Sequence, residues 1–148
     1  MNKYPAWWNQ AITVYNKSLD PQTKVVTWYK TVILDCFWKA AGNKVTINDT
    51  TIDTNNIVCR IRKNENYRTP LEWFKLTNDE KANYFTLKQG DIIIGDLVED
   101  DINEYLNGHR STDILKKYQA LQLAMTIQNV SNNTGVGKGN EHYYISGE

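Results

Sequence analysis

Residues 132–140, which read NNTGVGKGN, are the stretch with the strongest likeness to a ligand-binding motif. A phosphate-binding loop needs an opening glycine, then a lysine followed by Ser or Thr to hold magnesium, and then a helix. Here Asn132 stands at the opening position, Gly139 follows Lys138, and only nine residues remain after Gly139. We therefore interpret these residues as a turn before the last strand, or a loop at an interface, in which glycines supply positive φ. Nucleotide binding stays the weaker alternative.

A second candidate is a run of acidic residues between positions 96 and 104. Clustered carboxylates can hold a hard cation, but these lack the spacing and the central glycine of a helix-loop-helix calcium site. We expect instead a solvated face, or a surface that pairs with Lys or Arg of a neighbouring subunit, and we predict no metal. As a docking or channel-lining surface it comprises Asp96, Glu99, Asp100 and Asp101.

The histidines and cysteines do not form a pattern typical of a metal site or of a catalytic site. His109 and His142 are the only histidines, and neither stands at a metal-ligand spacing from the other or from a cysteine pair. Cys36 and Cys59 each lie within an apolar run, where a thiolate is disfavoured, so we expect two buried free thiols. Because no nucleophile, base and orienting group come together, we predict that the protein is not an enzyme and uses no cofactor.

The aromatic residues, 11% of the chain, are numerous enough to form a stacking platform for single-stranded nucleic acid. Only Lys24, Lys30 and Lys39 lie near the early ones, and 17 basic residues against 17 acidic ones leave no net charge. A protein that coats nucleic acid is expected to carry a strong positive excess. Packing in the core and between subunits is therefore the favoured interpretation of Trp7, Trp8, Trp28, Tyr29, Phe37 and Trp38.

The pattern along the chain is mainly that of short strands. Lys24–Trp38 is the clearest, dense in β-branched and aromatic residues but long enough to require a bend or bulge. Lys44–Asn56 has a polar composition that suits a marginal hairpin or a long loop. Ser111 is a fair N-cap for one helix over Thr112–Leu121. Further strands are expected at Ala6–Asn16, Ile57–Arg62, Leu71–Leu76, Leu123–Val130 and Glu141–Ser146, with a hairpin over Tyr84–Leu97.

This pattern predicts a single domain over residues 1–148, a small β-barrel or β-sandwich with one short α-helix and a long polar loop. A chain of 148 residues is long enough to bury a core of its own. It shows no basic start followed by an apolar run, and no segment long and apolar enough to cross a bilayer. We therefore expect neither a signal peptide nor a membrane partner.

Several strings of residues along the chain resemble a family of small proteins from tailed bacteriophages of low-GC Gram-positive hosts. They are WWNQAITVYN at 7–16, DPQT at 20–23, VVTWYKTVILDCFWK at 25–39, TNNIVCRI at 54–61, NYFTLKQGDIII at 83–94, the stretch 107–118, and NTGVGKGNEHYY at 133–144. The likeness covers nearly the whole chain, and its strings are distinctive but structural rather than catalytic. Such proteins are encoded among head and neck genes and resemble head-completion, or stopper, proteins.

The resemblance implies a β-barrel that forms a homo-oligomeric ring, six- or twelve-fold, in the virion neck, between the connector or portal and the tail terminator. In that group a long loop projects into the channel and helps retain packaged double-stranded DNA without sequence specificity. The expected locations are the virion and, during assembly, the host cytoplasm. A connector or tail terminator, and a single-stranded nucleic-acid-binding module, are the alternatives. By position the loop is Gly42–Asn56, with candidate channel residues Asn43, Lys44, Thr46, Asn48, Asp49, Thr50 and Thr51.

Overall fold

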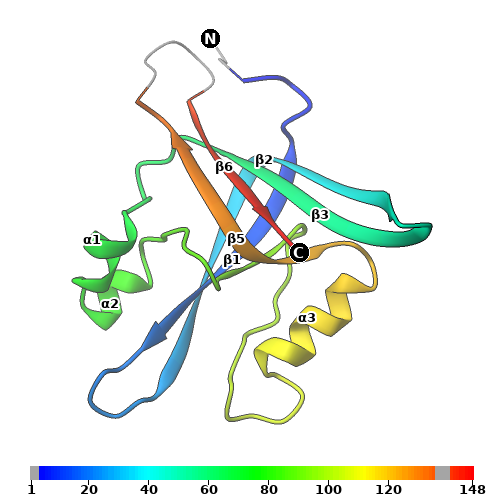
Figure 1. Cartoon of the computed structure of the whole chain (residues 1–148). Coiled ribbons are helices and arrows are strands. Elements are labelled where there is room, and N and C mark those ends of the chain that lie inside the picture. Colours follow the sequence, from blue (N-terminus) through cyan, green and yellow to red (C-terminus); the bar gives the residue numbers. More distant parts are fainter. Residues whose placement is uncertain (1–3, 136–140) are drawn as a thin grey trace.

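The computed structural model describes residues 4–135 and 141–148, and for 41–47 and 51–55 it describes the backbone alone. Within these residues six antiparallel strands close into a barrel in the order β1-β2-β3-β6-β5-β4 (Figure 1). The predicted mainly-β fold is confirmed, and of the two predicted architectures the barrel is the one present. The elements are β1 (Gln10–Leu19), β2 (Val26–Ile47), β3 (Thr50–Arg62), α1 (Pro70–Phe74), α2 (Asn78–Lys81), β4 (Ile92–Ile94), α3 (Ser111–Gln119), β5 (Ala124–Asn133) and β6 (His142–Gly147).

The barrel interior is filled by apolar side chains from all around the wall. Ile12 and Val14 of β1 are fully buried there, together with Ile61 of β3. Side chains of a barrel strand alternate between interior and exterior, and filling the interior removes apolar surface from water. Cys36 and Cys59 are also buried, and both are free thiols, as predicted.

Strand β2 is 22 residues long and changes partner part way along. It pairs with β1 as far as Cys36, and with β3 from Phe37 to its end. Just before the change, a step of two residues on β1 faces a step of three on β2, and Asp35 has a φ of 58°. Asp tolerates the left-handed region better than most residues do, so it suits such a bulge. The predicted bend or bulge within Lys24–Trp38 is confirmed.

A second apolar cluster lies outside the barrel, beneath α3 and the segment that precedes it. Tyr15 of β1 and Ile94 of β4 meet Ile102 of that segment and Ile114 of α3. The predicted helix is present as α3. It ends before Leu121, which is 64% exposed rather than part of the apolar face. Helix α3 therefore covers the outer side of the wall instead of filling the interior.

The predicted strand over Leu71–Leu76 is wrong, because helix α1 occupies most of it. Thr69 caps this helix: its hydroxyl accepts the Glu72 N–H at 3.3 Å, while the Glu72 carboxylate accepts the Thr69 N–H at 3.2 Å. Pro70 follows at the first helical position, where its missing N–H costs nothing. Among the described residues no helix combines the length and apolar character needed to cross a membrane.

The predicted hairpin over Tyr84–Leu97 is half present. Its second limb contains β4, and the turn lies at Gly90, which has a φ of 94°. The first limb is irregular: Phe85 forms an isolated bridge to Tyr67, and the side chain of Asn16 pairs with the backbone of Thr86. The buried Asn16 amide donates to the Thr86 carbonyl at 2.7 Å and accepts the Thr86 N–H at 3.2 Å. These bonds satisfy backbone groups that a ladder would otherwise have to pair.

Candidate functional site

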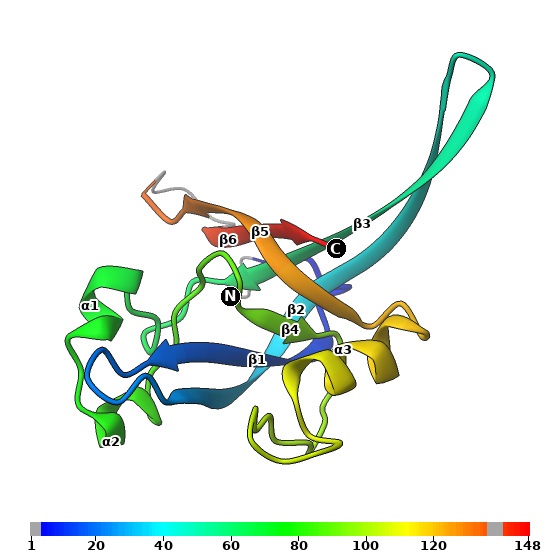
Figure 2. The same cartoon turned by 60° about the horizontal axis from the view of Figure 1, so that its bottom comes forward.

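The far end of the β2–β3 hairpin forms an arm that projects from the barrel (Figure 2). From Ala41↔Asn56 to Ile47↔Thr50 the two strands pair in seven consecutive steps. The neighbouring ladder to β6 begins only at Ile57, so within the described residues no third strand supports the arm. Seven extended residues reach about 23 Å at ~3.3 Å each. Of the two interpretations drawn from the sequence, a hairpin or a loop, the hairpin is the one present.

The tip of the arm is a two-residue turn. Asn48 and Asp49 have φ values of 51° and 64°, the left-handed conformation that tight hairpin turns require and that Asn and Asp tolerate. Together with Thr50, they are exposed. All seven candidate channel residues thus lie on the arm, three of them at its tip. The structure describes the backbone alone for Asn43, Lys44, Thr46 and Thr51.

The acidic residues predicted as a docking or channel surface lie on the segment that covers β1. Asp100 accepts a hydrogen bond from the Tyr118 hydroxyl, which holds the pKa of that carboxyl below its ordinary value. Asp101 forms an ion pair with Lys30 of β2 at 3.0 Å. At least some of these acidic residues therefore pair with lysines of the same chain and not with those of a neighbouring subunit. Exposed carboxylates remain on Asp96 and Glu99.

The structure does not bring the acidic segment and the arm together. The acidic segment lies with α3 on the outside of the barrel, whereas the arm leaves the barrel elsewhere and points away (Figures 1 and 2).

The two histidines lie on different elements, and the two cysteines are buried together in the barrel core. His109 is exposed on the segment before α3, whereas His142 in β6 has its ring edge-on to Trp8, with 5.5 Å between centroids. Among the described residues no group of three His, Cys, Asp or Glu side chains is placed to hold a metal ion. Burial raises the pKa of the Cys36 thiol to about 12, so this thiol is protonated and a poor nucleophile at neutral pH.

The glycine-rich stretch 132–140 lies only partly within the described residues. Asn132 is near the C-terminal end of β5, and its side-chain oxygen accepts the Thr134 N–H at 3.0 Å. This hydrogen bond is typical of the start of a turn. Lys138 and Gly139, on which the nucleotide alternative depends, lie outside the described residues.

The first aromatic residues form a cluster that also contains a cation. Trp7, Trp8 and Phe37 contact one another with ring centroids 5.3 to 6.4 Å apart, and the Arg60 guanidinium lies 5.5 Å from the Phe37 centroid. Sequence analysis missed Arg60 because it is distant in the chain, although the register pairs it directly with Phe37. Trp7 is 59% exposed and Trp8 only 3%. The cluster therefore offers one well-exposed indole.

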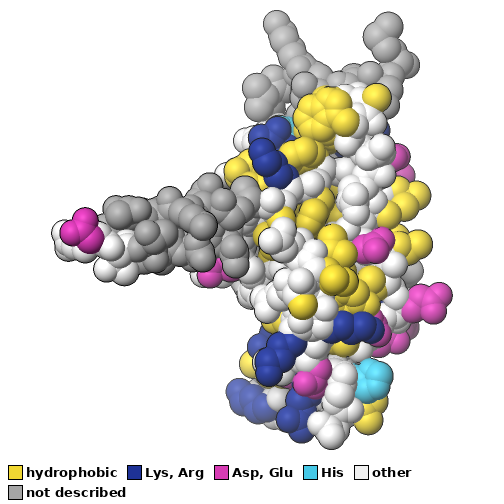
Figure 3. Space-filling view, turned by 90° about the vertical axis from the view of Figure 1, so that its right-hand side faces the viewer, with side chains coloured by type: hydrophobic (Ala, Val, Ile, Leu, Met, Phe, Trp, Pro, Cys, Tyr) yellow, Lys and Arg dark blue, Asp and Glu magenta, His cyan; other side chains and the backbone are white. Residues whose placement is uncertain are grey.

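Large apolar side chains are exposed on several parts of the surface, and on one face they form a broken band beside the arm (Figure 3). Val32 and Leu34 share the outer side of β2, and Leu34 is 65% exposed. Leu97 follows Asp96, whose carbonyl accepts the hydroxyl of Thr13, the residue opposite Val32, and it is 59% exposed. Exposed apolar patches commonly mark interfaces. Large apolar side chains are also exposed at Trp7, Leu71, Phe74, Tyr105, Leu106 and Leu121.

The fold and these surfaces define a class of protein: a closed six-stranded antiparallel barrel that carries a projecting hairpin arm. Over residues 7–148 the chain matches a family of unknown function, DUF6751, and it belongs to that family. No curated protein and no solved structure matches the chain. The matched region includes the arm as well as the barrel.

Proposed function

We propose that this protein is a ring subunit in the neck of a tailed bacteriophage, where it joins the connector or portal to the tail terminator and helps to retain packaged DNA. The observation that carries the proposal is the arm, a two-stranded hairpin that extends about 23 Å beyond the last supporting strand pair. The resemblance of its sequence strings to those of phage neck proteins is the reason for proposing this location.

The arm needs an assembly to define its position. An isolated two-stranded hairpin is only marginally stable in water, and its outer edges present backbone N–H and C=O groups. In a ring, copies of the arm that point toward the axis lie close to one another. They narrow the channel and stabilise each other there.

The surface of the barrel suits a homo-oligomer. The exposed side chains of Val32, Leu34 and Leu97 offer apolar area that a neighbouring copy can bury. The absence of net charge leaves little long-range repulsion between copies. A six- or twelve-fold ring repeats one such contact around its axis.

The tip of the arm suits contact with DNA that must later leave. Asn48, Asp49 and Thr50 are exposed and polar, and the Asp49 carboxylate repels phosphates. Tight binding to the DNA backbone depends on the neutralisation of phosphates by Lys or Arg, and such contacts would hinder ejection. The arm therefore acts as a steric barrier without sequence preference.

The test is a phage in which residues 44–53 are replaced by an Asn-Gly turn. This keeps the Asn43↔Thr54 pair and every pairing of β3 with β6, so the barrel should fold and join the particle. We expect heads that fill and then lose DNA before tails attach. The readout is nuclease-protected DNA per head, with electron microscopy of filled and empty heads.

The matched control is Asp49→Gly, which keeps the length of the arm and its left-handed turn. Heads of this variant should retain DNA. Normal retention by the short-arm variant would refute the barrier role. A nonsense mutation tests the placement: complete tails beside emptied heads support the neck, and normal particles with a replication defect contradict it.

Two alternatives are separated by further measurements. A connector or tail terminator would occupy a different ring in a cryo-EM map of the neck. A single-stranded nucleic-acid-binding module is favoured by the Trp7 indole and by Arg60 over Phe37. Submicromolar, strongly salt-dependent binding of oligo-dT in a polarisation assay would support that module, and its absence would remove it.

A further inference from the structure

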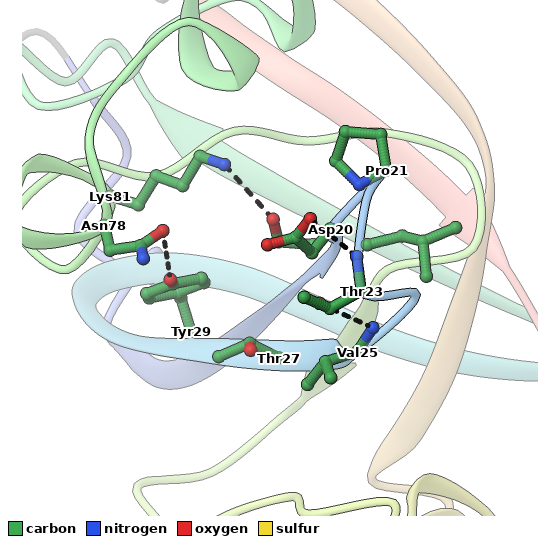
Figure 4. A pocket seen from close by; sticks show the side chains of 10 residues that line it. Asp20, Pro21, Thr23, Val25, Thr27, Tyr29, Asn78 and Lys81 are labelled. Atoms are coloured by element: carbon green, nitrogen blue, oxygen red, sulfur yellow. Dashed lines mark hydrogen bonds between the residues drawn. The ribbon is translucent and has the colours of Figure 1, made fainter.

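A polar pocket of about 450 Å³ opens between the β1–β2 turn and helix α2 (Figure 4). Pockets that bind small ligands have volumes of about 300–1,000 Å³, so this one is large enough for a small ligand. Much of its lining is hydroxyl or amide: Ser18, Thr23, Thr27, Tyr29 and Asn78. One wall is closed by a hydrogen bond of 3.3 Å from the Tyr29 hydroxyl to the Asn78 side-chain oxygen.

Lys81 places a buried cation at this pocket. The residue is 8% exposed, and Figure 4 shows its side chain extended along the pocket toward β1. Its ammonium group donates to the Ser18 hydroxyl at 3.1 Å and lies 5.0 Å from the centroid of the Trp73 ring. Among the described residues no carboxylate lies within 4.0 Å of it.

Lys88, a second lysine near Trp73, differs from Lys81 because it has a carboxylate partner. The Lys88 ammonium is also 5.0 Å from the Trp73 centroid, on a side chain that is 16% exposed. Lys88 has a carboxylate partner, however, since Asp91 contacts it at 2.5 Å. Buried charges in proteins are normally paired, because burial without a partner has a high free-energy cost. Of the two ammonium groups near the Trp73 ring, that of Lys88 is in a direct ion pair, whereas that of Lys81 has no carboxylate within 4.0 Å in the described part of the chain and interacts with Asp20 of the same pocket only at longer range.

We propose that this pocket binds a carboxylate, with Lys81 as the residue that recognises its charge. The ammonium has donors to spare, since it can make three hydrogen bonds and Ser18 accepts one. A carboxylate that enters the pocket supplies an ion-pair partner in direct contact with Lys81 and further hydrogen-bond acceptors for its ammonium group. The surrounding hydroxyl and amide groups add hydrogen bonds to whatever carries it. This inference does not depend on a role in the phage neck.

Asp20 adds a negative charge at the pocket rim. Backbone N–H groups of Gln22 and Thr23 donate to its side chain at 2.8 and 3.2 Å, and they lower the pKa of that carboxyl. The charge of Lys81 lowers the same pKa further. Asp20 is therefore ionised at neutral pH, and an entering anion is attracted by Lys81 and repelled by Asp20.

The test is a ¹H–¹⁵N NMR titration of the full chain with sodium acetate at pH 7, with sodium chloride added to hold ionic strength constant. We expect saturable shifts of the Thr23, Val25 and Asn78 amides, with half-saturation on the order of 10 mM for so small a ligand. Lys81→Met should weaken binding at least tenfold. The matched control is Lys24→Met, which removes the same charge from an exposed residue of the same turn.

Each outcome has a defined meaning. Absent or unsaturable shifts in the wild type, or equal weakening by Lys24→Met, would overturn the proposal. Lys81→Met should melt at the wild-type temperature or above it, since it removes a buried cation that has no carboxylate within 4.0 Å among the described residues. A short peptide with one glutamate, Ac-Ala-Glu-Ala-amide, distinguishes a carboxylate carried by a protein chain from one carried by a small molecule. Tighter binding than acetate indicates a carboxylate on a protein chain, and equal binding indicates a small molecule.

Discussion

Replacement of Gly147 by alanine places a methyl group against the backbone of the neighbouring strand. The added Cβ would lie 2.0 Å from the carbonyl oxygen of Thr126 in β5 and 2.9 Å from its carbonyl carbon. Close carbon–oxygen contacts in sheets begin near about 3.3 Å, so the strands must separate by roughly 1 Å. Thr126 and Glu148 exchange two backbone hydrogen bonds at this point, of 2.8 and 3.3 Å, and both would be weakened or lost.

The expected loss in the free energy of unfolding is about 2–6 kcal/mol. Two backbone hydrogen bonds contribute about 0.5–1.5 kcal/mol each, and overpacking adds about 1–3 kcal/mol. Urea unfolding followed by tryptophan fluorescence measures it. Gly135→Ala is the control, because its added Cβ meets no atom within 4 Å, and it should change the free energy by less than about 0.5 kcal/mol. A Gly147→Ala change equally small would refute the β5–β6 closure.

Two pH-dependent effects follow from the pKa shifts. Burial raises the pKa of Tyr143 to about 12, whereas the pKa of tyrosine in the unfolded chain is about 10. The stability that the neutral Tyr143 side chain contributes is therefore fully present below about pH 10. Between about pH 10 and pH 12 it falls by about 1.4 kcal/mol per pH unit. Urea unfolding at pH 9 and pH 11 should show a smaller drop in Tyr143→Phe than in the wild type, and an equal drop contradicts the assignment. Tyr118→Phe should lower stability by about 1 kcal/mol at pH 7. Because Tyr118 lowers the pKa of Asp100, this difference should shrink as the pH falls below about 4, and a constant difference down to pH 2 would contradict it.

The strands of the barrel were predictable where β-branched and aromatic residues are dense. Lys24–Trp38 was predicted both as a strand and as too long to be regular, and the bulge at Asp35 is the result. The error at Leu71–Leu76 had a local cause. Thr69, Pro70 and Glu72 are a helix N-cap, a first helical position and a capping-box partner, and this signal should outweigh the apolar content that favoured a strand.

The candidate sites depended more on contacts that are distant in the chain. The tip of the arm was predictable, since Asn48 and Asp49 are turn residues between two polar strands. The burial of Lys81 was not, because the residues 78–81, NDEK, have the composition of an exposed turn. Lys81 is buried by Trp73 and by the start of the β1–β2 turn, and no short-range pattern records that packing.

Strand β2 runs as one strand, with a single bulge, from the β1–β2 turn through the barrel wall to the tip of the arm. A mechanical load along the arm therefore enters the barrel along a strand axis. Hydrogen bonds between antiparallel strands lie perpendicular to that axis, so a longitudinal pull shears many of them together instead of opening them one by one. The arm is thus anchored by the length of the wall behind it, an arrangement that resists sustained pressure.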